Sequence, residues 1–299
     1  MKLSVVVSTL NDRERLLPCL DALAEQLPSE TETIVVNGPS SDGTTGAVRE
    51  RAEVDVLVEI SDRYRSVSRN AGIEVATGET IAFLGDEYAV EPTWYDAVEA
   101  AVEADADVVT GPVKHHPSGD AETEPRRIAG RSVTTFAGDN VAFDRNVIEA
   151  LDGFDEYLET GSTDDCAHRV AALDFDVTWS GAMAVRSEVG TDGGSADPEW
   201  GGRYRSLNYR LAKNYGPRPS VLARSAGSAL SDGLGDARGL LSGRTTPTSW
   251  FANGVDVAVN SLGGLKDGVV ARYRDRSSRK NPNGVSSRHD RAVQVYDRR

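Results

Sequence analysis

Residues 78–88 read Gly-Glu-Thr-Ile-Ala-Phe-Leu-Gly-Asp-Glu-Tyr, a short apolar run that ends on two adjacent carboxylates. A β-branched and aromatic run of this length is typical of a buried central strand. In open α/β sheets, ligands bind in the crevice beyond the carboxyl ends of the strands, where Asp86 and Glu87 would then lie. Their hard oxygens suit Mg²⁺ or Mn²⁺ shared with a substrate diphosphate. The alternative is a solvated turn after a strand, and the neighbouring segments must distinguish the two.

Before this stretch, strand and helix patterns alternate along the chain. Residues 3–7 form a β-branched run, and leucines at helical spacing follow between residues 16 and 27, with Asp12 as the expected helix cap. Residues 33–36 predict a second strand, and valines alternate over residues 54–58 as a third, edge-like strand. Each strand is therefore followed by a helix or a turn-rich loop.

The alternation continues after residue 58. Ser66 is expected to cap a helix that runs through Ala76, and Pro92 is expected to start another through Ala104. Further strands are predicted at residues 107–110, at 140–143 and around 177, with helices at 145–151 and about 164–173. Residues 115–131 are polar and contain prolines, which predicts a mobile loop. The whole pattern predicts an α/β fold with a mostly parallel sheet flanked by helices.

Charge is distributed unevenly along the 299 residues, whose formal net charge is −14. Residues 205–299 contain 17 lysines and arginines against 7 acidic residues, a net of +10, so residues 1–204 carry −24. Glycine, serine and arginine also become more frequent after residue 204. We therefore expect a domain over 1–204 and a basic carboxyl-terminal extension over 205–299, partly helical or disordered. The acidic, lysine-poor composition indicates a salt-loving host.

Two further features limit the cellular setting. No run approaches the roughly 18 apolar residues that a membrane helix needs, and the chain enters a strand without a signal peptide, so we expect a cytoplasmic protein. Cys19 and Cys166 match neither a disulfide framework nor a zinc spacing, and we expect two core thiols.

Four blocks of sequence, taken in order, resemble the inverting glycosyltransferases of family 2, which share the GT-A (Rossmann-like) nucleotide-diphospho-sugar fold. These blocks are residues 4–11, 34–44, 68–87 and 140–169, and from first to last they span about half of the chain. The resemblance implies a nucleotide-sugar donor. In that family the loop after the second strand holds the nucleobase and ribose. In this chain Asn37 stands where an aspartate is common. Because its amide oxygen can still pair with uracil, the resemblance implies a UDP-linked donor. A plain turn is the alternative for this loop.

The resemblance also assigns site residues. The expected donor-binding side chains are Thr9, Asn11, Asn37, Asp42, Arg69 and Asp86. Glu87, with Asp86 and the diphosphate, is expected to hold Mn²⁺ or Mg²⁺, although Gly85 replaces the first acid that the family often has. Arg69 offers fixed donors to a diphosphate or base carbonyl, or it is a surface arginine on an exposed helix face.

The catalytic base is expected before the helix that ends near residue 173. Aligned on Arg169, the family's acidic motif places Thr163 at the usual base position, and threonine cannot act as a base near neutral pH. Asp164 or Asp165 must then deprotonate the acceptor. The alternative is that these aspartates only stabilise the first helical turn. Arg186 stands near a histidine of many relatives and could contact phosphate.

From the resemblance we expect a sugar transferase, with a hexuronic acid as a candidate sugar, that acts on a polyprenyl (dolichol) phosphate-linked glycan for N-glycosylation of a surface layer. The +10 tail suggests peripheral attachment to the cytoplasmic face of the cell membrane, and no nucleic acid partner is expected. A catalytically decayed module that binds a nucleotide or a partner enzyme is the main alternative. A nucleotidyltransferase is disfavoured because no glycine-rich, basic triphosphate loop follows the first strand.

Overall fold

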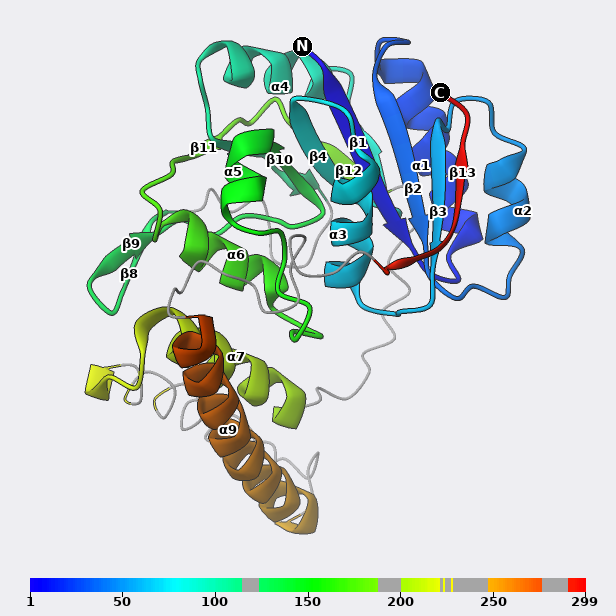
Figure 1. Cartoon of the computed structure of the whole chain (residues 1–299). Helices are drawn as coiled ribbons and strands as arrows, with labels where there is room; N and C mark the ends of the chain where they lie inside the picture. Colours follow the sequence, from blue (N-terminus) through cyan, green and yellow to red (C-terminus); the bar gives the residue numbers. More distant parts are fainter. Residues whose placement is uncertain (115–123, 188–199, 221–222, 224–226, 228–246, 276–289) are drawn as a thin grey trace.

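The computed structural model describes residues 1–114, 124–187, 200–220, 223, 227, 247–275 and 290–299. Its centre is an eight-stranded sheet in the order β11-β6-β10-β4-β1-β2-β3-β13 (Figure 1). In chain order these strands are β1 (Leu3–Thr9), β2 (Glu32–Asn37), β3 (Val56–Ile60), β4 (Thr80–Gly85), β6 (Val108–Thr110), β10 (Asn140–Asp144), β11 (Val177–Trp179) and β13 (Ala292–Asp297). Strands β1 to β4 run parallel, as do β6 and β11, whereas β10 and β13 are antiparallel to their neighbours. The predicted α/β class is confirmed.

Helices cover both faces of this sheet because alternate strand residues point to opposite sides. The flanking helices are α1 (Arg13–Gln26), α2 (Thr44–Arg49), α3 (Arg65–Val75), α4 (Trp94–Glu103), α5 (Arg145–Ala150) and α6 (Ser162–Val170). On β1, Val6 belongs to the core shared with α3, α5 and α6, whereas Val5 and Val7 belong to the core shared with α1 and α4. Both faces are therefore filled, which leaves the strand ends for a ligand.

The two cysteines and two predicted helix caps can be compared directly with the structure. Cys19 and Cys166 are both buried and free, as expected of core thiols. Asp12 stands at the start of α1, but its side chain makes no capping hydrogen bond. The predicted Ser66 cap is wrong: α3 begins at Arg65, and the Ser66 hydroxyl lies inside the helix and donates to a main-chain carbonyl of the loop before α6.

Short strands beside the main sheet were missed in the sequence. A three-stranded sheet joins β5 (Tyr88–Val90), β12 (Val185–Ser187) and β7 (Val113–Lys114), and β8 (Arg126–Ile128) pairs with β9 (Arg131–Val133) as a hairpin. The predicted mobile loop over 115–131 is therefore wrong for residues 126–131, while 115–123 lie outside the described residues. Only Ile128 and Val133 of the hairpin are buried, too few to produce a visible alternation.

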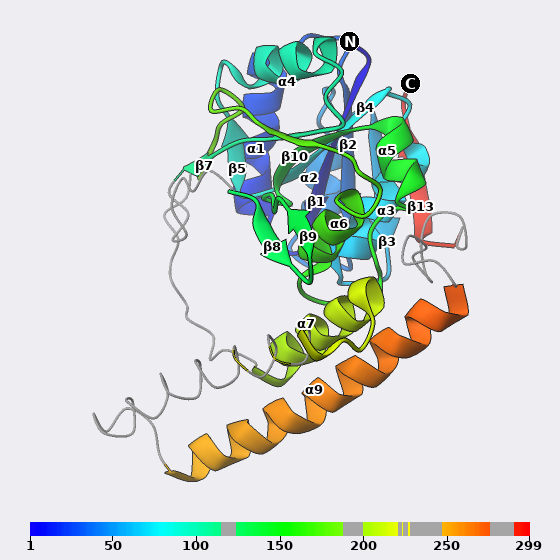
Figure 2. The same ribbon diagram turned by 90° about the vertical axis from the view of Figure 1, so that its left-hand side faces the viewer.

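The described carboxyl-terminal residues contribute one strand to the main sheet and a pair of helices beyond it. Helices α7 (Trp200–Tyr215) and α9 (Pro247–Asp275) pack on each other at one end of the molecule, and β13 lies along β3 (Figures 1 and 2). The third strand is thus not an edge strand, contrary to expectation. The buried Arg291 pairs with Glu74 and Glu156 and ties β13 to the domain. A separate basic extension is not confirmed, and the boundary proposed near residue 204 lies inside α7.

Candidate functional site

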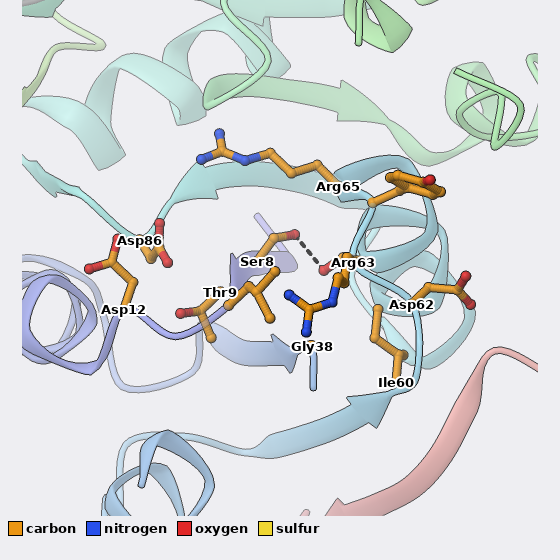
Figure 3. Close-up of a pocket in the computed structure, with 12 residues that line it drawn as sticks. Ser8, Thr9, Asp12, Gly38, Ile60, Asp62, Arg63, Arg65 and Asp86 are labelled. Atoms are coloured by element: carbon orange, nitrogen blue, oxygen red, sulfur yellow. Dashed lines mark hydrogen bonds between the residues drawn. The ribbon is translucent and has the colours of Figure 1, made fainter. Parts of the chain in front are cut away.

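A cavity of about 220 Å³ opens at the carboxyl ends of the parallel strands. Ser8 and Thr9 end β1, Gly38 follows β2, and Asp86 follows β4. The remaining lining residues are Leu10, Asp12, Ile60, Asp62, Arg63, Tyr64, Arg65 and Ser68. Arg63, between β3 and α3, and Arg65, the first residue of α3, extend toward the strand tips (Figure 3). The cavity therefore lies where the sequence predicted a ligand site, with Thr9 and Asp86 on its wall.

Asp86 is a buried carboxylate with no cation within ion-pair distance in the described part of the chain. Burial raises the pKa of Asp86 to about 6, and although Thr9 and Arg65 oppose this shift, the nearby Asp12 and Glu87 add to it. A carboxylate in this position costs free energy as long as it is charged and uncompensated. A cation brought by a ligand would relieve that cost.

Glu87 and Asp12 share one arginine at the rim of the cavity. The Arg15 guanidinium lies 3.6 Å from the Glu87 carboxylate and 3.5 Å from the Asp12 carboxylate. Burial raises the pKa of Asp12; Arg15 opposes this shift, and Glu87 adds to it. The Glu87 side chain is 26% exposed, so its oxygens remain accessible.

These residues fit a divalent metal only as part of a larger ligand set. In the described residues, no three His, Cys, Asp or Glu side chains gather in a group that could hold a metal ion. Asp86 and Glu87 offer carboxylate oxygens, which Mg²⁺ and Mn²⁺ prefer, and Mg²⁺ usually completes its coordination with substrate phosphates and water. The site therefore fits a cation that arrives with a diphosphate.

Arg69, Arg65 and Asp139 form a second charged group next to Asp86. Arg69 is buried and donates to the Asp139 carboxylate and the Gly138 carbonyl at 2.8 Å each, and Arg65 donates to Asp139 at 2.7 Å. Burial opposes the charge on Asp139, but the two arginines outweigh it and lower its pKa. Asp139 was not predicted from the sequence. A side chain added at Gly85 would meet the Asp139 Cβ at 3.0 Å, so Asp139 fills the space beside the acid position that Gly85 vacates.

Three residues predicted to bind the donor make hydrogen bonds within and between the loops after β1 and β2. The Asn11 carboxamide accepts from the main-chain N–H of Ser41 at 2.7 Å. The buried Asn37 donates to Thr45 at 3.0 Å and accepts from Ser40 at 2.7 Å. Asp42 accepts from the main chains of Arg13 and Thr44 at 2.9 and 3.1 Å. Their side chains therefore fix the loops after β1 and β2, and their role in donor binding stays a prediction.

The two candidate bases have different surroundings. Asp164 is 44% exposed and pairs with Arg210, whereas Asp165 is fully buried. Thr163, at the position expected for the base, accepts from Arg69 at 3.2 Å and so faces the charged group around Asp139. A Cβ at Gly138 would lie 2.2 Å from the Thr163 hydroxyl, so Gly138 permits this close approach.

Asp165 belongs to a buried ionic cluster between α6 and α7. Its carboxylate accepts from Arg169 at 2.8 Å, from Lys213 at 3.1 Å and from Asn214 at 2.7 Å. Lys213 also pairs with the buried Asp155. Burial opposes the charge on Asp165, but Lys213 and Arg169 hold its pKa well below the ordinary range. This cluster is balanced in charge and closed to solvent.

Other residues singled out in the sequence lie away from the cavity. Arg186 is on β12, and its guanidinium lies 3.4 Å from the Glu91 carboxylate. His168 is buried on α6, with its Nδ1 2.8 Å from the Tyr215 hydroxyl. The dense charges at 62–65, directly after a strand, were the signal by which Arg63 and Arg65 could have been found.

The fold agrees with comparisons to known proteins. The model of the family described as glycosyl transferase family 2 matches residues 4–155, about half of the chain. The chain belongs to glycosyl transferase family 2. Members similar to it include the uncharacterised glycosyltransferase YibD of Escherichia coli, 34% identical over 111 residues, and the glycosyltransferase AglE of Haloferax volcanii, 25% identical over 195 residues. These matches cover 36% and 59% of this chain, but only 32% of YibD and 64% of AglE.

Solved structures show the same fold. The mannosyltransferase PcManGT of Pyrobaculum calidifontis, in complex with GDP-Man and Mn²⁺, is 21% identical with a TM-score of 0.58, and the match covers 87% of each chain. TarS 1-349 of S. aureus, in complex with UDP-GlcNAc, is 17% identical with a TM-score of 0.63, and 93% of each chain is covered. This likeness identifies the family 2 member as a GT-A protein.

Proposed function

We propose that this family 2 member is an inverting, metal-dependent glycosyltransferase that moves a sugar from a UDP-linked donor to an acceptor hydroxyl. The observation that carries the proposal is Asp86, a buried carboxylate at the tip of a parallel strand and on the wall of a cavity, with no cation within ion-pair distance among the described residues. A buried charge of this kind suits a site completed by its ligand. Structural neighbours in complex with UDP-GlcNAc, or with GDP-Man and Mn²⁺, support a nucleotide-sugar donor.

The donor would lie across the strand tips. The nucleoside would occupy the cavity beside Thr9 and Gly38, against the loops fixed by Asn11, Asn37 and Asp42. Asp86 would contact the ribose and, with Glu87, a Mn²⁺ or Mg²⁺ ion on the diphosphate. That ion would supply positive charge for the departing nucleoside diphosphate. Arg65 and Arg69 would orient the phosphates, with Asp139 holding both guanidiniums in place.

For the base we propose Asp164. Its carboxylate is half-exposed and pairs with Arg210, whereas Asp165 would have to leave three hydrogen bonds inside a closed cluster. Asp165 would then position α6 through Arg169 and Lys213. In this arrangement Asp164 takes the proton of the acceptor hydroxyl as its oxygen attacks the anomeric carbon from the face opposite the diphosphate.

We extend the proposal to the acceptor. The similarity to AglE of Haloferax volcanii and the acidic, lysine-poor composition support a salt-adapted enzyme. We propose that it adds a sugar, with a hexuronic acid as the first candidate, to a dolichol phosphate-linked glycan for surface-layer N-glycosylation at the cytoplasmic face of the membrane. Deleting the gene and weighing the lipid-linked glycans by mass spectrometry tests this step: loss of one sugar is expected, and an unchanged glycan contradicts it.

A decayed nucleotide-binding module is the second candidate, favoured by Gly85 and Thr163 at two positions where the family has acids. Incubating the purified chain with UDP-sugars and Mn²⁺, with and without a polyprenyl phosphate-linked acceptor, separates the two. Transferase activity predicts UDP release that depends on Mn²⁺ and increases with acceptor. UDP-sugar binding without any release would support the decayed module.

A further inference from the structure

Helix α9 carries a stripe of exposed apolar side chains along its length. The members of this stripe, called the α9 stripe below, are Val255, Val259, Leu262, Val270 and Tyr273, between 40% and 69% exposed. Their spacing of three, four, seven or eight residues puts them on one side of a helix that turns by 3.6 residues. Most of the large exposed hydrophobic side chains in the described part of the chain belong to this stripe.

The opposite side of α9 is fixed against α7. A Cβ added at Gly264 would lie 2.1 Å from the Arg205 carbonyl oxygen, and one at Gly268 would lie 2.3 Å from the Tyr209 carbonyl oxygen. Ala271 on the same side is buried. The two helices therefore touch backbone to backbone, and α9 cannot rotate to bury its stripe without losing this contact. Figure 2 shows α9 crossing the end of the molecule with α7 on one side only.

The charges near the stripe are arranged for an anionic or neutral surface rather than a cationic one. Lys266, exposed, lies between Leu262 and Val270 on the same side of the helix. The acidic residues of this region are at the flanks: Asp267 pairs with Arg205 and Asp256 accepts from Asn260. The α9 stripe thus has one long cationic side chain, Lys266, beside its apolar members.

We propose that the α9 stripe lies in the interfacial layer of a lipid bilayer and holds the enzyme at the membrane. This deepens the proposed function, because it names the surface by which the protein would reach a lipid-linked acceptor. The stripe extends about 27 Å and is about one helix wide. Its surface area is therefore well below the roughly 800 Å² per partner that a stable dimer buries. Lys266 would be buried in a dimer, whereas at a bilayer its charged end reaches the headgroups.

Apolar contact between the α9 stripe and a bilayer would also hold the protein at high salt. At molar salt the Debye length is about 3 Å, so basic residues alone would lose most of their attraction to anionic lipid. Moreover, Arg272 donates to the carbonyls of Lys213 and Asn214 and is therefore occupied inside the protein. No helix in the described ranges is long and apolar enough to cross a bilayer, and an in-plane helix needs no such length.

The test is co-sedimentation of the full chain with phosphatidylcholine vesicles, with and without phosphatidylglycerol, at about 0.15 M and about 2 M NaCl. The stripe variant carries Val259→Gln and Leu262→Gln. Val293→Gln on β13 is the matched control, because Val293 is 71% exposed but lies outside α9. We expect the stripe variant to lose at least tenfold in vesicle partitioning at both salt concentrations, while Val293→Gln binds as the unchanged chain does.

A second substitution works in the opposite direction. Leu262→Trp is expected to strengthen vesicle binding several-fold and to give a blue-shifted fluorescence, because tryptophan favours the bilayer interface. Equal partitioning of all variants, or a dimer by sedimentation velocity that the Gln pair abolishes while vesicle binding is absent, overturns the proposal. The vesicles hold no acceptor and UDP binding is measured separately, so a failed donor site cannot produce either result.

Discussion

Asp86 and Asp165 are both buried aspartates, yet their surroundings shift their pKa values in opposite directions. Burial dominates at Asp86 and raises its pKa to about 6, whereas at Asp165 Lys213 and Arg169 outweigh burial and lower the pKa. The difference is the number of partners, since Asp165 has three hydrogen-bonded side chains and Asp86 has no cation within ion-pair distance among the described residues.

This contrast separates a structural cluster from a ligand site. A buried charge with its counter-ions and hydrogen bonds in place has nothing left to bind, and removing one partner leaves the others uncompensated. A buried charge without them is unstable on its own and gains most from a ligand that brings a cation. The seam between α6 and α7 belongs to the first kind, and the strand tips around Asp86 to the second.

The largest stability effect is expected at Asp165. Asp165→Asn leaves Lys213 and Arg169 with one anion fewer in a closed cluster, and the free energy of unfolding should fall by about 3–5 kcal/mol. Asp164→Asn removes only a half-exposed ion pair, which is worth about 0–1 kcal/mol. Urea unfolding of the two variants measures both. Equal losses would mean that the cluster is not the structural element described here.

The second effect is on turnover, where we expect the larger loss from substituting Asp164 and the smaller loss from substituting Asp165. If Asp164 is the base, Asp164→Asn should lower turnover by about 10²–10⁴-fold and leave donor affinity nearly unchanged, because a base acts only in the transition state. Turnover and UDP-sugar binding are measured on variants brought to equal folded fractions. A larger catalytic loss in Asp165→Asn under those conditions would transfer the role to Asp165.

How far the sequence predicts these features differs from one element to the next. The β-branched runs at 3–7, 33–36 and 81–84 predicted the central parallel strands, because strands covered on both faces are continuously apolar. Strand β13 could not be predicted, since Val293 and Val295 are exposed and its place depends on Arg291 meeting Glu74 and Glu156 from distant parts of the chain.

The residues of the candidate site also differ in how well the sequence predicts them. Its location followed from acids at the end of an apolar strand. Asp139 had no such signal, because it reaches Arg69 only through the antiparallel pairing of β10 with β4. A structural role for Asp165 could have been inferred from the sequence. Arg169 follows it by about one helical turn, and residues at this spacing lie on the same side of a helix.

A smaller effect with a distinct pH dependence is expected at Asp86. Its folded pKa of about 6 exceeds the ordinary value of 3.8, so its ionisation costs the folded state stability as pH rises through that window. Asp86→Asn removes the charge and should stabilise the protein at pH 8 by up to about 3 kcal/mol, with the gain vanishing below about pH 3.5. Thermal unfolding of both forms across pH checks this. A destabilised variant at pH 8 would mean that the carboxylate has a cationic partner after all.

The most direct test of the account is whether the strand-tip carboxylates bind a donor through a divalent cation. Glu87→Gln preserves size but removes the anion, and Glu149→Gln, 54% exposed on α5, is the matched control. UDP-sugar binding is measured by calorimetry with Mn²⁺ and with EDTA. In the presence of Mn²⁺, Glu87→Gln should bind the UDP-sugar at least tenfold more weakly than the unchanged chain, a loss of about 1.4 kcal/mol or more, while the control variant binds as the unchanged chain does. Mn²⁺-supported binding that is unchanged in Glu87→Gln would contradict the assignment of this site.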